Sequence, residues 1–292
     1  MKRRLIKQSR STLTVSMPST WIQKNKLKAG DELDVFERDT TLLLEAIQKK
    51  GEYNFELKID KDNAWYIGQI IRYCYFANFE KTRLFFTSAT IMQTIREEVQ
   101  KLIGFEIIEE EKDYCVIKNI SFEMEEEYPT LFRKVFLLTI QIFQELEKEK
   151  PNLQIIKSLH KDGQRFALFC RRVIIRNLDS LQKMNEYILL QRLTMISNNL
   201  VYFASEISQE KRVITVNEKV NLLFCKKLYH LYYTAYYTPE YNKLLALNEG
   251  REYFTKMIRK QKDNTFTQQY FCEIVRLLSS SGSLILYGGL KK

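Results

Sequence analysis

The sequence is short of the residue types on which many catalytic and metal centres depend. It has two histidines, His160 and His230, in 292 residues, so a histidine-rich catalytic or metal centre is nearly excluded. Its five cysteines are an odd number, contain no C-x-x-C pair and each lie in an apolar stretch. We expect reduced core residues and neither a disulfide framework nor a zinc site. The cysteines are Cys74, Cys115, Cys170, Cys225 and Cys272.

Long hydrophobic runs are also missing. No apolar stretch approaches the roughly 18–20 residues of a membrane-spanning helix, and the run 135–142 is interrupted by Thr139 and Gln141. The N-terminus is basic, but residues 8–11 are polar where a signal peptide would be apolar. We therefore expect a cytoplasmic protein with no membrane insertion.

Acidic residues are absent from the first 28 positions, which we call the basic segment. It holds eight of the 46 basic residues and none of the 36 acidic ones, so it accounts for most of the net charge of +10. Such a segment suits a polyanion or an anionic membrane surface better than a small acidic substrate. The eight basic residues are Lys2, Arg3, Arg4, Lys7, Arg10, Lys24, Lys26 and Lys28.

Residues 1–46 predict a strand, a short helix and two further strands. Leu13, Val15 and Met17 alternate with hydroxyl residues, which is typical of a half-buried strand. Because so few apolar positions make a poor core for one small unit, we expect this piece to complete its core by dimerisation.

Residues 52–120 predict a β-α-β-α-β-β subdomain, with Asp60 or Asp62 capping the first helix and Ser88 capping the second. With only nine glycines and four prolines in the chain, long helices are expected beyond residue 123, in two sets of three. The expected helices are 130–149, 152–177, 183–209, 217–237, 240–262 and 265–287. The tyrosine-rich end of the fourth is expected to be core or dimer interface, with a partner surface as the alternative; its members are Tyr229, Tyr232, Tyr233, Tyr236 and Tyr237.

Three segments resemble a known family. They are 10–18 with Trp21, 25–33 and 95–110. The first two resemble the AbrB/SpoVT-like swapped-hairpin domain, and the third resembles the middle subdomain of archaeal proteins that fuse that domain to a PhoU-like helical region. The resemblance implies an α+β multidomain regulator: a DNA-binding and dimerisation domain at 1–48, an α/β subdomain at 49–121 and a PhoU-like all-α region of six helices at 122–292.

The helical region departs from the family pattern. PhoU-like bundles place carboxylates at i and i+4 facing a metal cluster, whereas the best local matches here hold neutral residues. Hydroxyls and amides do not offset the charge of a multinuclear metal cluster, so neither a metal nor another cofactor is expected. The positions concerned are Thr194 and Asn198, Ser279 and Ser283, with His160, Asp162 and Gln164 on the preceding helix.

The basic segment supplies the candidate DNA-binding residues. Lysine and arginine neutralise phosphates, hydroxyls donate to phosphate oxygens or base edges, and Arg10 is the best candidate for a base or minor-groove contact. The competing interpretation is an ordinary solvated strand edge. The candidates are Lys2, Arg3, Arg4, Lys7, Arg10, Ser11, Thr12, Thr14, Lys24 and Lys26.

The leading hypothesis is a sequence-specific, homodimeric regulator that binds double-stranded DNA, with a link to phosphate uptake implied by the resemblance. The alternative is a non-catalytic adaptor that docks on a phosphate transporter or signalling partner and uses its N-terminal domain for dimerisation. A third option is an antitoxin-like module. An enzyme is not expected, because no nucleophile, acid–base pair or cofactor loop is evident. The operator, the regulated genes and the sensed ligand cannot be read from the sequence.

Overall fold

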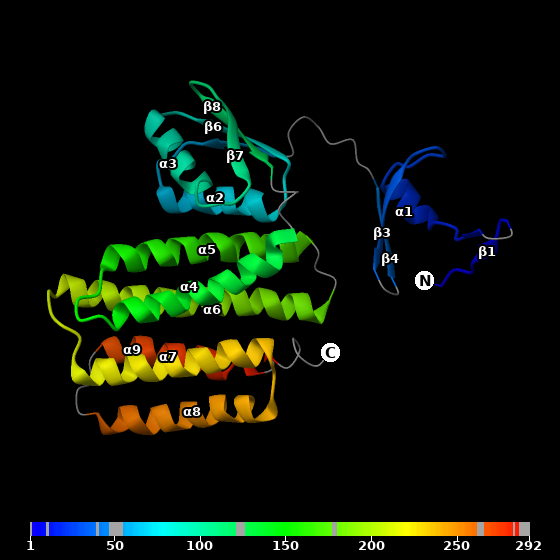
Figure 1. The fold of residues 1–292 in the computed structure, drawn as a ribbon. Coiled ribbons are helices and arrows are strands. Elements are labelled where there is room, and N and C mark those ends of the chain that lie inside the picture. Colours follow the sequence, from blue (N-terminus) through cyan, green and yellow to red (C-terminus); the bar gives the residue numbers. More distant parts are fainter. Residues whose placement is uncertain are drawn as a thin grey trace. The chain divides into compact units, whose positions relative to one another are not determined.

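The computed structural model describes most of the chain, which forms two compact units, Met1–Asn54 and Phe55–Lys292 (Figure 1). The expected division into three parts, at 48/49 and 121/122, stays a prediction. The described residues are 2–9, 12–38, 41–46, 55–120, 126–176, 180–261, 266–282 and 284–285.

The first unit contains short strands and one short helix. Strand β1 (Ile6–Lys7) pairs antiparallel with β2 (Leu13–Thr14), and β3 (Leu33–Arg38) pairs antiparallel with β4 (Thr41–Ala46). Helix α1 (Ser19–Lys24) follows β2. The expected strand, short helix, strand and strand are confirmed, with the addition of β1. The first expected strand is shorter than its alternating pattern, because β2 has only the two-residue β1 to pair with.

Among the residues of the first unit whose exposure the structure describes, none is buried within one protomer. Leu13 is 59% exposed and Leu42 is 66% exposed. The expectation that Leu13 and Val15 would be half-buried is therefore wrong for a single protomer, since Val15 is exposed as well. The physical reason is that this unit has too few elements to enclose an interior of its own.

The second unit begins with a four-stranded sheet and two helices. The order β-α-β-α-β-β is confirmed. The sheet has the strand order β5-β6-β8-β7, in which β5 and β6 are parallel and the other neighbours are antiparallel. The elements are β5 (Phe55–Ile59), α2 (Ala64–Phe76), β6 (Lys81–Phe86), α3 (Ala89–Val99), β7 (Phe105–Glu110) and β8 (Tyr114–Asn119).

Of the two helix caps expected in this subdomain, one is confirmed and the other is wrong. Ser88 caps α3 as expected, because its Oγ accepts from the Ile91 amide at 3.3 Å. Helix α2 is capped by Asn63 and not by Asp60 or Asp62, since Asn63 Oδ1 accepts from the Tyr66 amide at 2.9 Å. An asparagine side chain caps as well as an aspartate, so residue type alone does not choose between them.

Six described helices follow and form the helical body, in which the expected two sets of three are confirmed (Figure 1). The first set consists of α4, α5 and α6, and the second consists of α7, α8 and α9. The two sets are joined by contacts of α6 with α9 and of α4 with α7. One core runs through both sets. The helices are α4 (Tyr128–Leu146), α5 (Leu153–Arg176), α6 (Leu181–Gln209), α7 (Val216–Tyr237), α8 (Tyr241–Lys260) and α9 (Thr267–Ser279).

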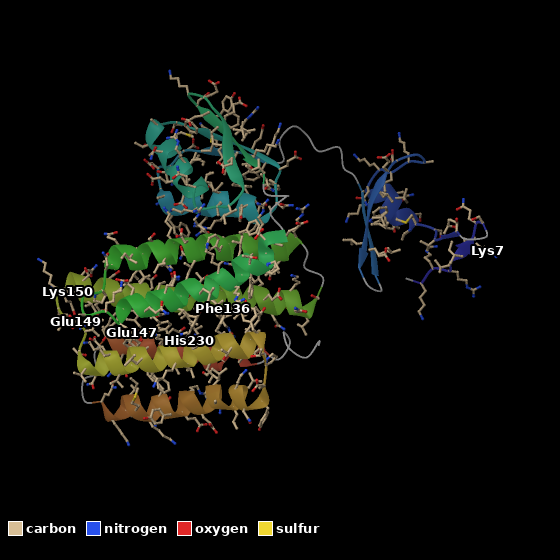
Figure 2. The ribbon with its side chains drawn as sticks, in the orientation of Figure 1. Lys7, Phe136, Glu147, Glu149, Lys150 and His230 are labelled. Atoms are coloured by element: carbon tan, nitrogen blue, oxygen red, sulfur yellow. The ribbon has the colours of Figure 1, made fainter. Side chains whose placement is uncertain are left out.

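Aromatic side chains fill the interface between the two sets of helices. Phe136 of α4, labelled in Figure 2, lies among tyrosines of α7, with ring centres 6.2 Å from Tyr229 and 6.3 Å from Tyr232. Both tyrosines are buried. The expectation that the tyrosine-rich end of this helix belongs to the core is confirmed for Tyr229 and Tyr232, whereas Tyr237 is 37% exposed.

The cysteines divide into two groups. All five are free, and four are buried as expected. Cys272 is exposed, so its assignment to the core is wrong. It lies on the amphipathic helix α9, whose apolar face buries the neighbouring Phe271. A cysteine next to a core position in the sequence therefore falls outside the core-facing side of the helix.

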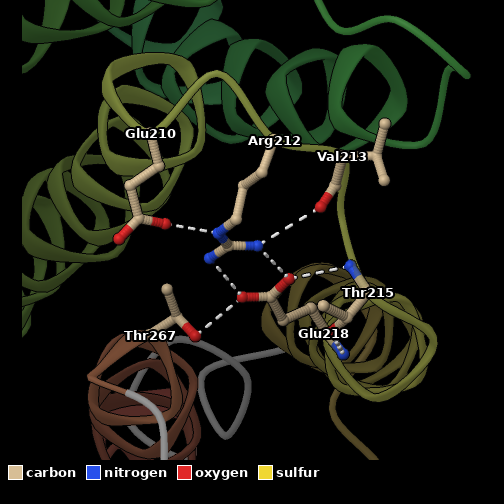
Figure 3. A network of polar contacts seen from close by, with 6 residues as sticks. All are labelled: Glu210, Arg212, Val213, Thr215, Glu218 and Thr267. Atoms are coloured by element: carbon tan, nitrogen blue, oxygen red, sulfur yellow. Dashed lines mark hydrogen bonds and ion pairs between the residues drawn. The ribbon is translucent and has the colours of Figure 1, made fainter.

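A buried ion pair fixes the connection between α6 and α7 (Figure 3). Arg212 donates from both terminal nitrogens to the two carboxylate oxygens of Glu218, each at 2.8 Å. Glu218 is 3% exposed and also accepts from the Thr215 amide and the Thr267 hydroxyl, each at 2.8 Å. Burial alone would raise the pKa of Glu218, but these hydrogen bonds lower it overall. The network therefore ties α9 to the start of α7.

Candidate nucleic-acid interface

The first half of the candidate interface is the β1–β2 hairpin. Lys7 lies opposite Leu13, and Ile6 lies opposite Thr14. The turn is closed by the Gln8 amide, which donates to the Thr12 carbonyl at 3.0 Å, and by the Thr12 amide, which donates to Ser9 Oγ at 3.2 Å. Two of the expected DNA-binding residues, Arg10 and Ser11, lie outside the described residues.

The basic side chains of this hairpin and of the residues before it are exposed and unneutralised. Lys2, Arg3, Arg4 and Lys7 are all exposed; Lys7 is labelled in Figure 2. None of the four makes an ion pair with a carboxylate within the described part of the chain. Their charge is therefore available to an external anion, and that anion would have to displace only water and counterions.

The second half of the interface is α1 and the turn after it. Lys24 lies in the last turn of α1, where Asn25 Nδ2 donates to the Trp21 carbonyl at 2.9 Å. Lys26 has a φ of +54°, and the exposed Gly30 has a φ of +95°. The nearby carboxylate of Asp31 accepts from the Lys28 amide at 2.7 Å. Lys24 and Lys26 are exposed, so this turn adds two free cations.

The two threonines of the hairpin differ in their availability. Thr14 Oγ1 donates its proton to the Ile6 carbonyl at 3.3 Å, which supports the strand pairing. Thr12 is exposed, and no hydrogen bond of its hydroxyl occurs within the described residues. A phosphate oxygen accepts protons and donates none. Thr12 is therefore the stronger candidate for a phosphate contact.

The neutral positions of the helical body pair with one another. His160 Nδ1 lies 3.0 Å from Ser197 Oγ, and Gln164 Nε2 donates to Asn198 Oδ1 at 3.3 Å, so polar side chains join α5 to α6. Burial lowers the pKa of His160. Sequence reasoning missed Ser197, although its position between Thr194 and Asn198 on a polar stretch of α6 was a usable signal.

Two more of these positions bond to their own helices. Thr194 Oγ1 donates to the Leu190 carbonyl at 2.9 Å, and Ser279 Oγ donates to the Val275 carbonyl at 2.9 Å. Such i to i−4 bonds occupy the hydroxyl proton. Ser283 lies outside the described residues. Across the described ranges there is no group of three or more histidine, cysteine, aspartate or glutamate side chains able to hold a metal ion.

Comparison with known proteins gives one match. Residues 6–52 match the family model described as antidote-toxin recognition MazE, bacterial antitoxin. The match covers the first unit and supports a swapped-hairpin domain there. No curated protein and no solved structure matches the chain. Among the described residues, no helix is long and apolar enough to cross a membrane.

Proposed function

We propose that the chain is a homodimeric regulator that binds double-stranded DNA through residues 1–48. The observation that carries the proposal is the combination of exposed cations, unneutralised within the described residues, with exposed apolar side chains such as Leu13 and Leu42 in the same unit. The cations suit a phosphate backbone. The exposed apolar side chains suit pairing with a second copy, which would cover them. The match to an antitoxin family over the same residues supports both halves of this argument.

The remaining parts of the proposal rest on resemblance and on composition. The body is proposed to be PhoU-like and of archaeal type, with a link to phosphate uptake. The protein is proposed to be non-enzymatic and cytoplasmic. The polar pairs between α5 and α6 support a body that works through contacts, because amides and hydroxyls fill the positions where that family carries carboxylates.

The test is a mobility-shift titration of the full chain with random and genomic duplex DNA across salt concentration. We expect binding that weakens steeply as salt rises, because each neutralised phosphate releases counterions. A variant that carries Lys2→Gln, Arg3→Gln and Lys7→Gln is expected to bind more weakly and with a smaller salt slope.

The matched control removes the same charge from the second unit. Lys112, Lys157 and Lys219 are exposed and make no ion pair within the described residues. Their triple replacement by glutamine is expected to leave DNA binding unchanged. Equal losses in the two variants, or no duplex binding at low salt, would reject the DNA-binding proposal.

An antitoxin-like role is the second candidate, favoured by the description of the matching family. In that case the chain would bind a partner protein, and DNA binding would accompany that role. Purification of the tagged full chain from its native cell, followed by mass spectrometry, separates the possibilities. A single small partner protein recovered in an amount equal to that of the tagged chain would favour the antitoxin hypothesis. Recovery of phosphate-transport or signalling components without DNA binding would favour the adaptor.

A further inference from the structure

A basic cleft lies between the α/β subdomain and the helical body. It has a volume of about 350 Å³, which falls in the range of small-molecule sites. Its walls come from α2 and α3 on one side and from α5 on the other. The side chains that matter for its chemistry are Trp65, Arg72, Glu98, Lys101, Lys161 and Arg165.

The two sides of the cleft belong to one packed unit. Leu168 of α5 packs against the core of the α/β subdomain. Arg172 Nη2, also on α5, donates to Asn78 Oδ1 at 2.8 Å. A ligand in the cleft would therefore contact two elements whose spacing is already set, and it would lose little free energy to ordering them.

On the α2–α3 side, one carboxylate is held between two cations. Glu98 Oε2 lies 3.4 Å from Arg72 Nη1, and Glu98 Oε1 pairs with Lys101 Nζ. Gly68 makes this arrangement possible, because a Cβ there would stand 2.8 Å from Glu98 Oε2. Glu98 is buried. This side already carries one more positive than negative charge.

The α5 side adds two cations with no partner of their own. Lys161 and Arg165 are one helical turn apart, and neither makes an ion pair within the described residues. The Nε of Arg165 is buried and has no hydrogen-bond partner. That nitrogen is closed off by protein atoms, so the contribution of Arg165 to the cleft is its positive charge. The cleft as a whole has four cations and one carboxylate.

An indole forms part of the cleft lining. Trp65, in the first turn of α2, is 71% exposed, which is unusual for the largest apolar side chain. When a planar ring stacks on this indole, the two facing ring surfaces are removed from water. Cations together with an exposed indole are the surroundings that a phosphate attached to an aromatic base requires.

We propose that this cleft binds a nucleotide, with its phosphate on Lys161, Arg165 and the Arg72–Lys101 side and its base on Trp65. Because the cleft is lined by the α/β subdomain and the helical body, the bound nucleotide links these two parts. This site is separate from the basic segment, so it does not depend on the DNA-binding proposal.

Fluorescence quenching tests the proposal directly. The chain has two tryptophans, so Trp21→Phe leaves Trp65 as the one indole reporter in the full chain. The probes are the four nucleoside monophosphates (AMP, GMP, CMP and UMP), adenosine and inorganic phosphate. We expect saturable quenching of Trp65 by at least one monophosphate, with weaker binding of the same nucleoside and of phosphate alone.

Variants on α5 provide the charge test. Lys161→Gln and Arg165→Gln are each expected to weaken nucleotide binding about ten-fold, as the loss of one charge-assisted hydrogen bond would. Lys157→Gln is the matched control, because Lys157 is exposed one turn earlier on the same helix and does not line the cleft. It is expected to bind as the parent does.

Several results would overturn the proposal. They are the absence of saturable quenching up to about 1 mM nucleotide, equal binding of inorganic phosphate and nucleotide, and equal loss in Lys157→Gln and Arg165→Gln. Saturable quenching of Trp65 fluorescence by duplex DNA, with no quenching by mononucleotides, would also overturn it. A failure of DNA binding by the basic segment would leave these readouts unchanged, so the two proposals fail separately.

Discussion

The guanidinium carbon of Arg172, on α5, lies 4.4 Å from the ring centre of Tyr75, on α2. It also lies 5.4 Å from the ring centre of Phe105, and the arginine is 4% exposed. A planar cation between aromatic rings is attracted by both of them, and it keeps its hydrogen bond to Asn78. This residue thus joins the helical body to the α/β subdomain through both its ring contacts and its hydrogen bond.

Arg172→Lys is therefore expected to destabilise the second unit by about 2 kcal/mol, because an ammonium neither stacks on the rings nor reaches Asn78 in the same geometry. Urea unfolding followed by circular dichroism measures the change. Arg165→Lys, on the same helix and with no ion pair among the described residues, is the control and is expected to stay within about 0.5 kcal/mol. Equal effects would show that the stacking of Arg172 contributes nothing specific.

Two helical glycines are expected to respond in opposite directions to alanine. Gly68→Ala should destabilise by about 1 kcal/mol, because its Cβ would stand 2.8 Å from Glu98 Oε2 and the carboxylate would have to shift away from Arg72 and Lys101. Gly163→Ala should stabilise by about 0.5–1 kcal/mol, since its Cβ would meet only Leu138, at 3.9 Å. Urea unfolding of both variants decides the matter. A stabilising Gly68→Ala would contradict the close approach of Glu98 to α2.

The Arg212–Glu218 pair predicts a specific loss of stability in acid. The pKa of Glu218 is lowered from 4.5 in the folded chain, so its stabilisation is present above that value and is lost as pH falls through the folded pKa. Glu218→Gln is expected to cost about 3 kcal/mol at neutral pH and to flatten the acid side of the stability curve. Urea unfolding at a series of pH values measures both effects.

Glu210→Gln is the control for that prediction. Glu210 pairs with the same arginine, but its side chain is 50% exposed. Exposed pairs contribute little, so this variant is expected to lose less than about 1 kcal/mol and to keep the parent's acid limb. A Glu210→Gln variant as damaged as Glu218→Gln would mean that burial of the pair is not the deciding factor.

His160 predicts a second loss of stability, nearer to neutral pH. Burial lowers its pKa below 6.5 in the folded chain, so the unfolded chain binds the proton first as pH falls. Stability is full above 6.5 and decreases from there toward the folded pKa. His160→Gln is expected to remove this decrease. Ser197→Ala keeps the buried imidazole and is expected to retain it, so a flat profile in Ser197→Ala would contradict burial as the cause.

Periodicity made much of the second unit predictable. Helices such as α6 show their core face in the sequence, because Leu193, Ile196 and Leu200 recur at helical spacing and are buried. The α/β order followed from the change of period. The residue that caps α2 and the exposure of Cys272 each depend on where a helix begins or faces to within one residue. A pattern of residue types does not resolve such differences.

Relations between distant residues were beyond the sequence. His160 pairs with Ser197 of another helix, and Trp65 and Arg165, also from two helices, line one cleft. Each partner looks ordinary in its own segment, because an arginine on a helix usually points to water. The prediction that Leu13 is half-buried is wrong for a related reason. Alternation indicates which face of a strand is apolar, but it does not indicate which chain covers that face.

The exposed apolar side chains of the first unit, such as Leu13 and Leu42, have a consequence for dosage under the proposed pairing of two copies. A unit that gains its interior only from a second copy assembles in a reaction of second order in chain concentration. Well below the dissociation constant, halving the amount of chain would leave about a quarter of the assembled pairs. Occupancy of a DNA target would then depend on the expression level more steeply than for a DNA-binding domain that folds as a monomer. Modest changes in synthesis or turnover would therefore produce a threshold-like response.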